Sequence, residues 1–432
     1  MIQTTDEQER ELTARLGPSA VRRASPRRRV TQISSVVLAL VLCGRVVLAQ
    51  SPAPPLTLDA ALQLALANNK TIAAARLQRG VSQAAVDVAR ERPNPDLTYE
   101  AARETPRDAV MLTLPLELGG KRNARVSAAQ AAVASDEARL DAVIAGVMDE
   151  VRHTYIGLLA AQQRVVITQD VADLFARARD AAHARFQAGA VPRRDDIAAQ
   201  ADFLVAQADV AQARGDVRAT RATLNALLGQ PLGTEVTVVP APPQSTPALE
   251  AAFARLEGAN TELRVLDREI AVQQARIAVA RSMQTADISA GGGLSFDAQP
   301  EFSVGWRVNF GVTVPLFTAH KAGVAVENAA LVRLRAERDA TRAEIQGAVG
   351  AAIERAASAA ERVRAYENDI LPLSLQDEAF AQASYQSGQT GLNDLVLALQ
   401  HARERRFAAL QASLDLQTAL ADLERAITGS IR

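Results

Sequence analysis

The chain has 432 residues, of which 48% are hydrophobic and only 3% are aromatic. A composition so poor in aromatic residues favours long helices over a β-sandwich or an α/β enzyme core. The net charge of −1 excludes a strongly basic surface of the kind that holds nucleic acid, so no nucleic-acid partner is expected.

Residues 1–49 have the pattern of a secretory signal peptide. An apolar stretch from Ile33 to Leu42 follows a basic region, and Ala49 ends a cleavage site. The basic region contains Arg22, Arg23, Arg27, Arg28 and Arg29. A membrane anchor is the alternative, but Arg45 interrupts the apolar run well short of the roughly 20 residues that a span needs. We therefore expect the chain to be exported.

Cys43 is the only cysteine in the sequence. Lipid attachment is one alternative, since Leu40 stands three residues earlier, but Leu42 occupies the preceding position, where lipoprotein signals carry Gly, Ala or Ser. If Cys43 leaves with the signal peptide, the mature chain has neither disulfides nor thiolate metal sites.

The remaining sequence contains two copies of one pattern, a feature that decides the fold class. The matched residues are Leu58 with Leu249, Asn69 with Asn260, Asp96 with Asp287, Pro115 with Pro315, Lys121 with Lys321, Gly189 with Gly388 and Asp195 with Asp394. The separation is 191 positions for the first three pairs and 199 or 200 for the others. The second copy therefore has a longer insertion between Asp287 and Pro315.

Residues 302–314 alternate between apolar and polar side chains, which is typical of a strand with two different faces. The apolar positions expected to face lipid are Phe302, Val304, Trp306, Val308, Phe310 and Val312. Residues 288–296 alternate in the same way, and residues 297–301 supply a turn. The first copy carries a shorter hairpin from Leu97 to Leu116.

Two hairpins could cover a soluble core, which is one interpretation. However, the neighbouring sequence offers no further strands, and an isolated hairpin is only marginally stable. Strands of this length can cross a membrane if they belong to a closed barrel. Four strands cannot close a barrel, because known barrels begin at about eight. We therefore expect an oligomer, and a homotrimer would supply twelve strands.

Long helices occupy most of the other residues. The segment Lys121–Gln187 would be about 100 Å long at 1.5 Å per residue. The second copy repeats it over Gly323–Ser384, with a kink expected at Pro372. Each long helix ends at a glycine turn and returns through another helix, over residues 194–228 and 392–427. The expected fold class is mainly α with β-hairpins.

The expected organisation follows from these elements. In order, the segments are a signal peptide (1–49), a first-repeat helix (50–95), a first membrane hairpin (96–118), a first long helical hairpin (119–229), a linker (230–247), a second-repeat helix (248–286), a second membrane hairpin (287–317) and a second long helical hairpin (318–432).

Several motifs accompany the duplication. They are the start Leu58-Asp59-Ala60, the strand end Leu114-Pro115-Leu116, the turn from Tyr385 to Gly388 and the following Asp394. Together they resemble the TolC-like outer-membrane factor family over essentially the whole mature chain. The run Leu116-Glu117-Leu118-Gly119-Gly120-Lys121-Arg122 looks like the cobalt–zinc–cadmium (heavy-metal) efflux subfamily, although residues 315–323 depart from that subfamily's usual pattern.

This resemblance implies a duplicated TolC-like fold. A homotrimer would form a 12-stranded β-barrel in outer-membrane lipid, with a helical tunnel extending into the periplasm. It also implies docking to a periplasmic adaptor (membrane fusion) protein and an inner-membrane RND transporter, and export of heavy-metal cations. The alternatives are multidrug efflux, a type I protein-secretion duct of the same fold and, in another class, a soluble periplasmic coiled-coil structural protein.

No catalytic or cofactor-binding pattern occurs in the sequence, and we expect neither an enzyme nor a metal site. The histidines are scattered without ligand spacing; they are His153, His183, His320 and His401. The run Gly119, Gly120, Lys121 and Arg122 lacks the full phosphate-loop pattern. We interpret it as a strand–helix junction near the membrane interface.

The two helix–turn–helix tips are the candidate functional ends of the helices. The expected adaptor-docking residues are Phe186, Gly189, Asp195, Tyr385 and Gly388. The expected periplasmic gate is formed by Tyr385, Gly388 and Asp394, of which Asp394 matches by resemblance an acidic residue at the family's constriction. Three copies would form a carboxylate ring that favours cations. The alternative is that Asp394 caps the returning helix.

Overall fold

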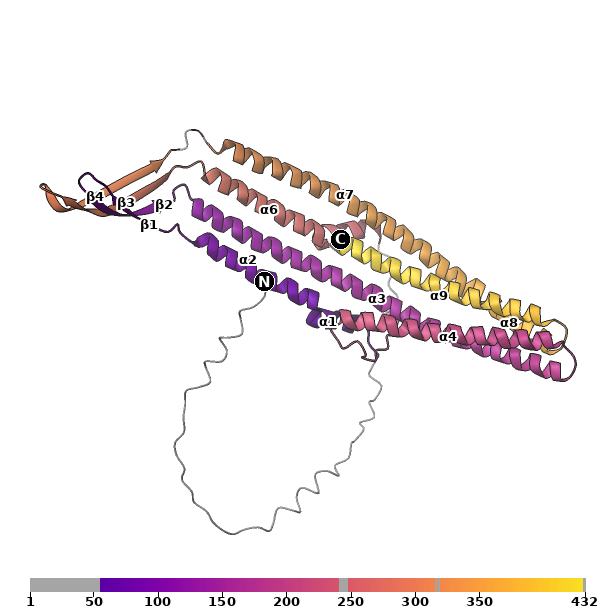
Figure 1. Cartoon of the computed structure of the whole chain (residues 1–432). Helices are drawn as coiled ribbons and strands as arrows, with labels where there is room; N and C mark the ends of the chain where they lie inside the picture. Colours follow the sequence, from indigo (N-terminus) through magenta and orange to yellow (C-terminus); the bar gives the residue numbers. More distant parts are fainter. Residues whose placement is uncertain (1–54, 241–247, 315–316, 318, 430–432) are drawn as a thin grey trace, which may run out of the picture. The chain divides into compact units, whose positions relative to one another are not determined.

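The computed structural model describes residues 55–240, 248–314, 317 and 319–429. They belong to one compact unit, Ala53–Arg432. The predicted signal peptide and Cys43 lie outside the described residues, as do residues 241–247 of the predicted linker. The described residues are mainly helical and contain one four-stranded sheet, which confirms the predicted fold class (Figure 1).

The two copies have the same order of elements. The first contains α1 (Leu58–Asn68), α2 (Lys70–Arg90), β1 (Asp96–Ala101), β2 (Asp108–Leu116), α3 (Lys121–Gln187) and α4 (Arg193–Leu227). The second contains α5 (Leu249–Ala259), α6 (Thr261–Ser282), β3 (Asp287–Ala298), β4 (Phe302–Thr313), α7 (Lys321–Ala365), the π-helical turn η1 (Tyr366–Ile370), α8 (Leu371–Gln386) and α9 (Leu392–Thr428).

Each N-terminal segment, expected as one helix, is broken in two at an asparagine. The Asn69 Oδ1 atom accepts hydrogen bonds from the backbone N–H of Thr71 (2.9 Å) and of Ile72 (3.1 Å), so Asn69 caps α2. Its Nδ2 atom donates to the Leu227 carbonyl (2.8 Å) at the end of α4. Asn260 caps α6 in the same way. Each break therefore ties the start of its copy to the end of that copy's returning helix.

The long helices set the distance between the sheet and the tips. Helix α3 spans the predicted range and is about 100 Å long at 1.5 Å per residue. Its counterpart is divided by η1, which directly precedes α8, and Pro372 is the second residue of α8. Proline cannot donate a backbone hydrogen bond and clashes with the preceding turn, so the helix widens there locally. The sheet and the tips lie at opposite ends of α3.

The sheet joins the two copies. Its strand order is β1-β2-β3-β4, and all neighbours are antiparallel. Within the hairpins, Asp96 lies opposite Thr113 and Asp287 lies opposite Thr313. These pairs match at the separations of the repeat, so both hairpins have the same register. The central β2–β3 pair is the junction between the copies.

The core of the unit is divided among several clusters along the helices. One surrounds the fully buried Tyr155 of α3, whose hydroxyl lies 2.8 Å from the Leu56 carbonyl and 2.7 Å from the Val239 carbonyl. Another packs α3 and α4 against α8 and α9 towards the tips. Burial between two long helical hairpins stabilises helices that would otherwise be marginal.

Candidate membrane sheet and helical tips

One face of the sheet is apolar across all four strands. Leu97, Leu112, Gly292 and Val308 lie side by side on this face, as do Tyr99, Val110, Leu294 and Trp306. The predicted lipid-facing residues of β4 also lie here, and all are exposed; the Trp306 and Phe310 side chains are 80% and 81% exposed. An exposed apolar face of this extent marks a surface that contacts lipid or another protein.

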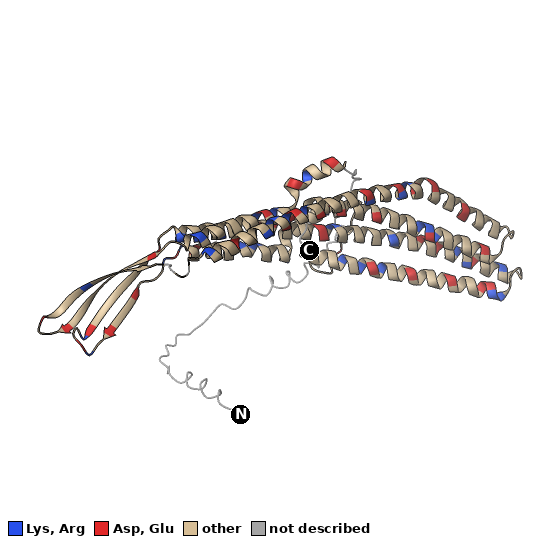
Figure 2. Ribbon diagram, turned by 90° about the horizontal axis from the view of Figure 1, so that it is seen from above, with Lys and Arg blue, Asp and Glu red and all other residues tan. Residues whose placement is uncertain are grey.

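The opposite face is more polar and is lined by small residues. Asn309 lies opposite Gly291, and Arg307 lies opposite Gly293. A Cβ atom at Gly293 would stand 2.1 Å from the Val110 backbone carbonyl oxygen, so glycine is required at this position. Figure 2 shows that charged residues are frequent along the helices and sparse on the strands. The sheet therefore has the two unlike faces that the alternation predicts.

Both edges of the sheet are open in the single chain. Within the described residues, β1 pairs only with β2, and β4 pairs only with β3. Each edge strand leaves one row of backbone N–H and C=O groups without a partner in the sheet. Such groups cannot remain unpaired in lipid, so the sheet is incomplete as a membrane structure.

The strand–helix junction is built around a left-handed turn. Gly119 (φ +68°) and Gly120 (φ +71°) both adopt a backbone conformation that favours glycine. Lys121 then begins α3 with its side chain only 6% exposed, and its Nζ atom lies 2.7 Å from the Asp287 Oδ1 atom of β3. The Arg122 Nε atom donates to the Arg90 carbonyl (2.7 Å). Lys121 is therefore a buried link between the copies rather than an exposed interfacial cation.

Both tips end in the same backbone motif. The Gly189 N–H donates to the Phe186 carbonyl and the Ala190 N–H to the Arg185 carbonyl. The second tip repeats these bonds at Gly388 and Gln389, and both glycines have positive φ (+74° and +78°). These are Schellman caps, which require a residue that tolerates the left-handed conformation. The tip glycines thus have a structural role.

Tyr385 is buried beneath the second tip. Its side chain is about 1% exposed and packs in the cluster formed by α3, α4, α8 and α9. The Arg185 guanidinium lies 4.8 Å from the ring centroid, and its Nη1 atom donates to the Tyr385 carbonyl (3.2 Å). Burial raises the pKa of Tyr385, against the opposing effect of Arg185. Tyr385 joins the two tips and does not line a surface in the single chain.

The acidic residues of the tips differ in their contacts. Asp394 is exposed in the first turn of α9, and its Oδ2 atom accepts a hydrogen bond from the Gly391 N–H (3.3 Å). Asp195 lies in the first turn of α4, beside Asp196, whose carboxylate is 3.1 Å from the His183 Nδ1 atom. Asp394 therefore caps its helix while its carboxylate remains open to solvent. A role at a constriction is compatible with this geometry and remains a prediction.

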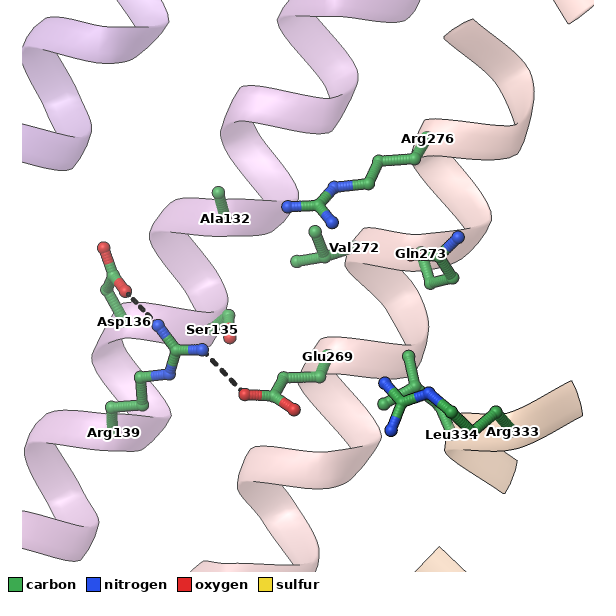
Figure 3. A pocket seen from close by; sticks show the side chains of 10 residues that line it. All are labelled: Ala132, Ser135, Asp136, Arg139, Glu269, Val272, Gln273, Arg276, Arg333 and Leu334. Atoms are coloured by element: carbon green, nitrogen blue, oxygen red, sulfur yellow. Dashed lines mark hydrogen bonds and ion pairs between the residues drawn. The ribbon is translucent and has the colours of Figure 1, made fainter. Parts of the chain in front are cut away.

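A pocket of about 290 Å³ lies between α3, α6 and α7 (Figure 3). Arg139 of α3 crosses it, with its guanidinium 2.7 Å from Glu269 of α6 and 3.4 Å from Asp136. The Arg139–Glu269 pair joins two helices, whereas Asp136 pairs with Arg139 within α3 and Arg333 pairs with Glu337 within α7. The pocket is a charged contact between the two copies.

His153 makes a contact that its sequence spacing did not indicate. Its Nδ1 atom is 3.0 Å from the Asp149 carbonyl and 3.3 Å from the Asp149 carboxylate, and its Nε2 atom is 3.0 Å from the Asp422 carboxylate of α9. The hydrogen bond to Asp149 raises the pKa of His153 to about 9, against the opposing effect of burial. No group of three or more metal-ligating side chains gathers among the described residues.

Among the described residues, no helix combines the length and apolarity needed to cross a membrane.

Comparison with known proteins supports the predicted resemblance. Residues 61–230, in the first copy, match the family described as "Outer membrane efflux protein". Over 270 residues the chain is 30% identical to the cobalt-zinc-cadmium resistance protein CzcC of Cupriavidus metallidurans. This match covers 61% of the chain and 63% of that relative, so it spans less than two thirds of the relative's length.

The fold is shared with solved outer-membrane proteins. The VceC protein of Vibrio cholerae superposes with a TM-score of 0.72 at 15% identity, covering 87% of this chain and 97% of that one. The CusC channel superposes with a TM-score of 0.70 at 15% identity, covering 86% and 92%. The resemblance to TolC-like outer-membrane factors is thus confirmed. The matched family and VceC are described as outer-membrane proteins, and CusC as forming a transmembrane channel; the likeness to the two solved structures shows that this chain has their fold.

Proposed function

We propose that the chain is the outer-membrane exit duct of a tripartite efflux system that exports heavy-metal cations. Its partners in this system would be a periplasmic adaptor protein and an inner-membrane RND transporter. The observation that carries this proposal is the sheet, which exposes one apolar face and two unpaired edges. Lipid can cover such a face, and further copies of the chain can pair with the edges. A homotrimer would supply twelve strands, an even number within the range of known barrels.

The helices support a duct rather than a short pore. Helix α3 carries the chain about 100 Å from the sheet to the first tip, and α7, η1 and α8 do the same in the second copy. The tips Phe186–Asp195 and Tyr385–Asp394 are therefore the parts farthest from the membrane. We assign to them the periplasmic mouth and the adaptor contact.

The proposed cargo rests on the relative CzcC. CzcC is named for resistance to cobalt, zinc and cadmium, and it is 30% identical over the matched region. A duct needs no tight metal site, because ions that bind too strongly do not leave.

The test is deletion of the gene in its native host, followed by complementation with the wild-type chain. We expect the deletion strain to stop growing at lower concentrations of Co²⁺, Zn²⁺ and Cd²⁺, and the chain to be extracted from envelopes only with detergent. Unchanged metal tolerance with sensitivity to dyes and antibiotics would indicate multidrug efflux. Loss of a secreted polypeptide would indicate type I secretion. Extraction without detergent would contradict every membrane duct and favour a soluble coiled-coil protein.

A further inference from the structure

The junction between the two copies carries an ion pair whose partners are both duplicated. Lys121 is the first residue of α3, and Asp287 is the first residue of β3. The Lys121 Nζ atom lies 2.7 Å from the Asp287 Oδ1 atom across the β2–β3 pair, and the Lys121 side chain is buried. The counterpart of Lys121 in the second copy is Lys321, the first residue of α7. The counterpart of Asp287 in the first copy is Asp96, the first residue of β1.

Lys321 and Asp96 are at opposite edges of the sheet and cannot meet within one chain. Lys321 follows the edge strand β4, and Asp96 begins the edge strand β1. Both are exposed, and neither side chain has a hydrogen-bond or ion-pair partner among the described residues. In a ring of identical chains, β4 of one chain would lie beside β1 of the next, as β2 lies beside β3.

The backbone at Lys321 is already arranged like the backbone at Lys121. The residue before each lysine caps its helix in the left-handed conformation: Gly120 has φ +71°, and His320 has φ +51°. A left-handed histidine is uncommon, so its presence at the matched position shows that the cap conformation before the lysine is kept in the second copy. Lys321 therefore begins its helix after the same left-handed cap as Lys121.

We propose that Lys321 of each chain pairs with Asp96 of the next copy, across a β4–β1 seam that repeats the register of β2–β3. This inference rests on the proposed oligomeric duct and specifies its subunit contact. In the β2–β3 pair, Thr113 lies opposite Gly291. Moving each residue to its counterpart in the other copy places Thr313 opposite Glu100 of the neighbouring chain.

The transferred register keeps like faces together. Thr313 and Glu100 both belong to the polar face of their strands, and the adjacent pair, Val312 with Ala101, falls on the other face. A shift by one residue would place Val312 beside Glu100 and turn one strand's apolar side chains to the polar face. The register obtained from the repeat is thus one that a two-faced barrel permits.

A disulfide across the seam tests the register. The variant with Thr313→Cys and Glu100→Cys should form a covalent ring on oxidation, because directly opposed residues of antiparallel strands have Cα atoms about 4.5–5.5 Å apart. The control pair Thr313→Cys and Thr98→Cys lies on the same face but is displaced by two residues, which exceeds the roughly 7 Å that a disulfide can bridge. We expect crosslinking in the first variant and a loss of it in the control. Equal crosslinking in both would overturn the register.

Charge reversal tests the ion pair itself. Lys321→Asp alone and Asp96→Lys alone should each reduce the amount of heat-resistant oligomer, because like charges would face each other across the seam. The double variant should restore it. If the double variant is no better than the single ones, the two side chains do not meet. Native mass measurement of the wild-type protein separates this outcome from failure of the proposed duct, since a stable monomer would remove the oligomer as well as the seam.

Discussion

The contact of His153 with two aspartates predicts a stability that depends on pH. Both ring nitrogens face acceptors, one at Asp149 and the other at Asp422. Only the doubly protonated ring can donate to both sides, so the folded chain favours the imidazolium. Because of this preference, the pKa of His153 is raised from the ordinary value of 6.5 to about 9. The contact links α3 of the first copy to α9 of the second.

The magnitude follows from that difference in pKa. A shift of one pKa unit corresponds to 1.36 kcal/mol, so the full shift is worth at most about 3 kcal/mol. The His153 side chain is 30% exposed, and solvent screening lowers this value to about 1–2 kcal/mol. Because the folded pKa is raised, the stabilisation is fully present below about pH 6.5 and is lost as the pH rises through about 9.

The assay is thermal unfolding of the purified protein in detergent, monitored by circular dichroism at pH 6 and at pH 10. His153→Gln should lower the midpoint temperature at pH 6 and have little effect at pH 10. His401→Gln is the matched control, because His401 is exposed on α9 and has no side-chain hydrogen bond with a described residue. A deficit of His153→Gln that is equal at both pH values would refute the reasoning.

Two further predictions concern the sheet and the tips. Phe310→Arg, on the exposed apolar face, should cost about 2–4 kcal/mol if it lies near the bilayer midplane, whereas Asn309→Arg on the opposite face should be tolerated. Heat-resistant oligomer on gels measures both, and equal tolerance would contradict the lipid assignment. Asp394→Ala should reduce block by multivalent cations in single-channel recordings, while Asp195→Ala should leave it intact. If neither change affects block or conductance, Asp394 is only a helix cap.

The elements that follow a local period could be predicted from the sequence. The strict alternation around Trp306 identified β4 and its apolar face, because side chains of a strand alternate between faces wherever the strand lies. The bounds of α3 were equally accessible, since a glycine precedes Lys121 and another follows Gln187. Pro372 indicated the irregularity before α8, although only the structure shows that it is a π-helical turn.

The contacts that join distant segments could not be predicted in this way. Asp422 lies 269 positions from His153, and neither residue carries a local signal for the other. The repeat matched Lys121 with Lys321 and Asp287 with Asp96. It gave no sign that Lys121 of the first copy pairs with Asp287 of the second. The break at Asn69 did have a signal, since asparagine is a favoured helix cap. It was obscured by the apolar and helix-forming residues on both sides.

The strand–helix junction connects two parts of the proposed duct, the strands and the helices, whose spacings differ. Strands lie about 4.8 Å apart, and a typical barrel tilt widens this spacing to about 6 Å around the circumference. Packed helices need about 8–10 Å. Each strand therefore leads to a helix that occupies more of the ring, and the few residues between them must change direction sharply. Gly119 and Gly120 supply that turn, and the pair between the buried Lys121 and Asp287 fixes the helix to the neighbouring strand where the spacing changes. The same requirement arises once per copy around the ring, which is why a second pair is expected at Lys321.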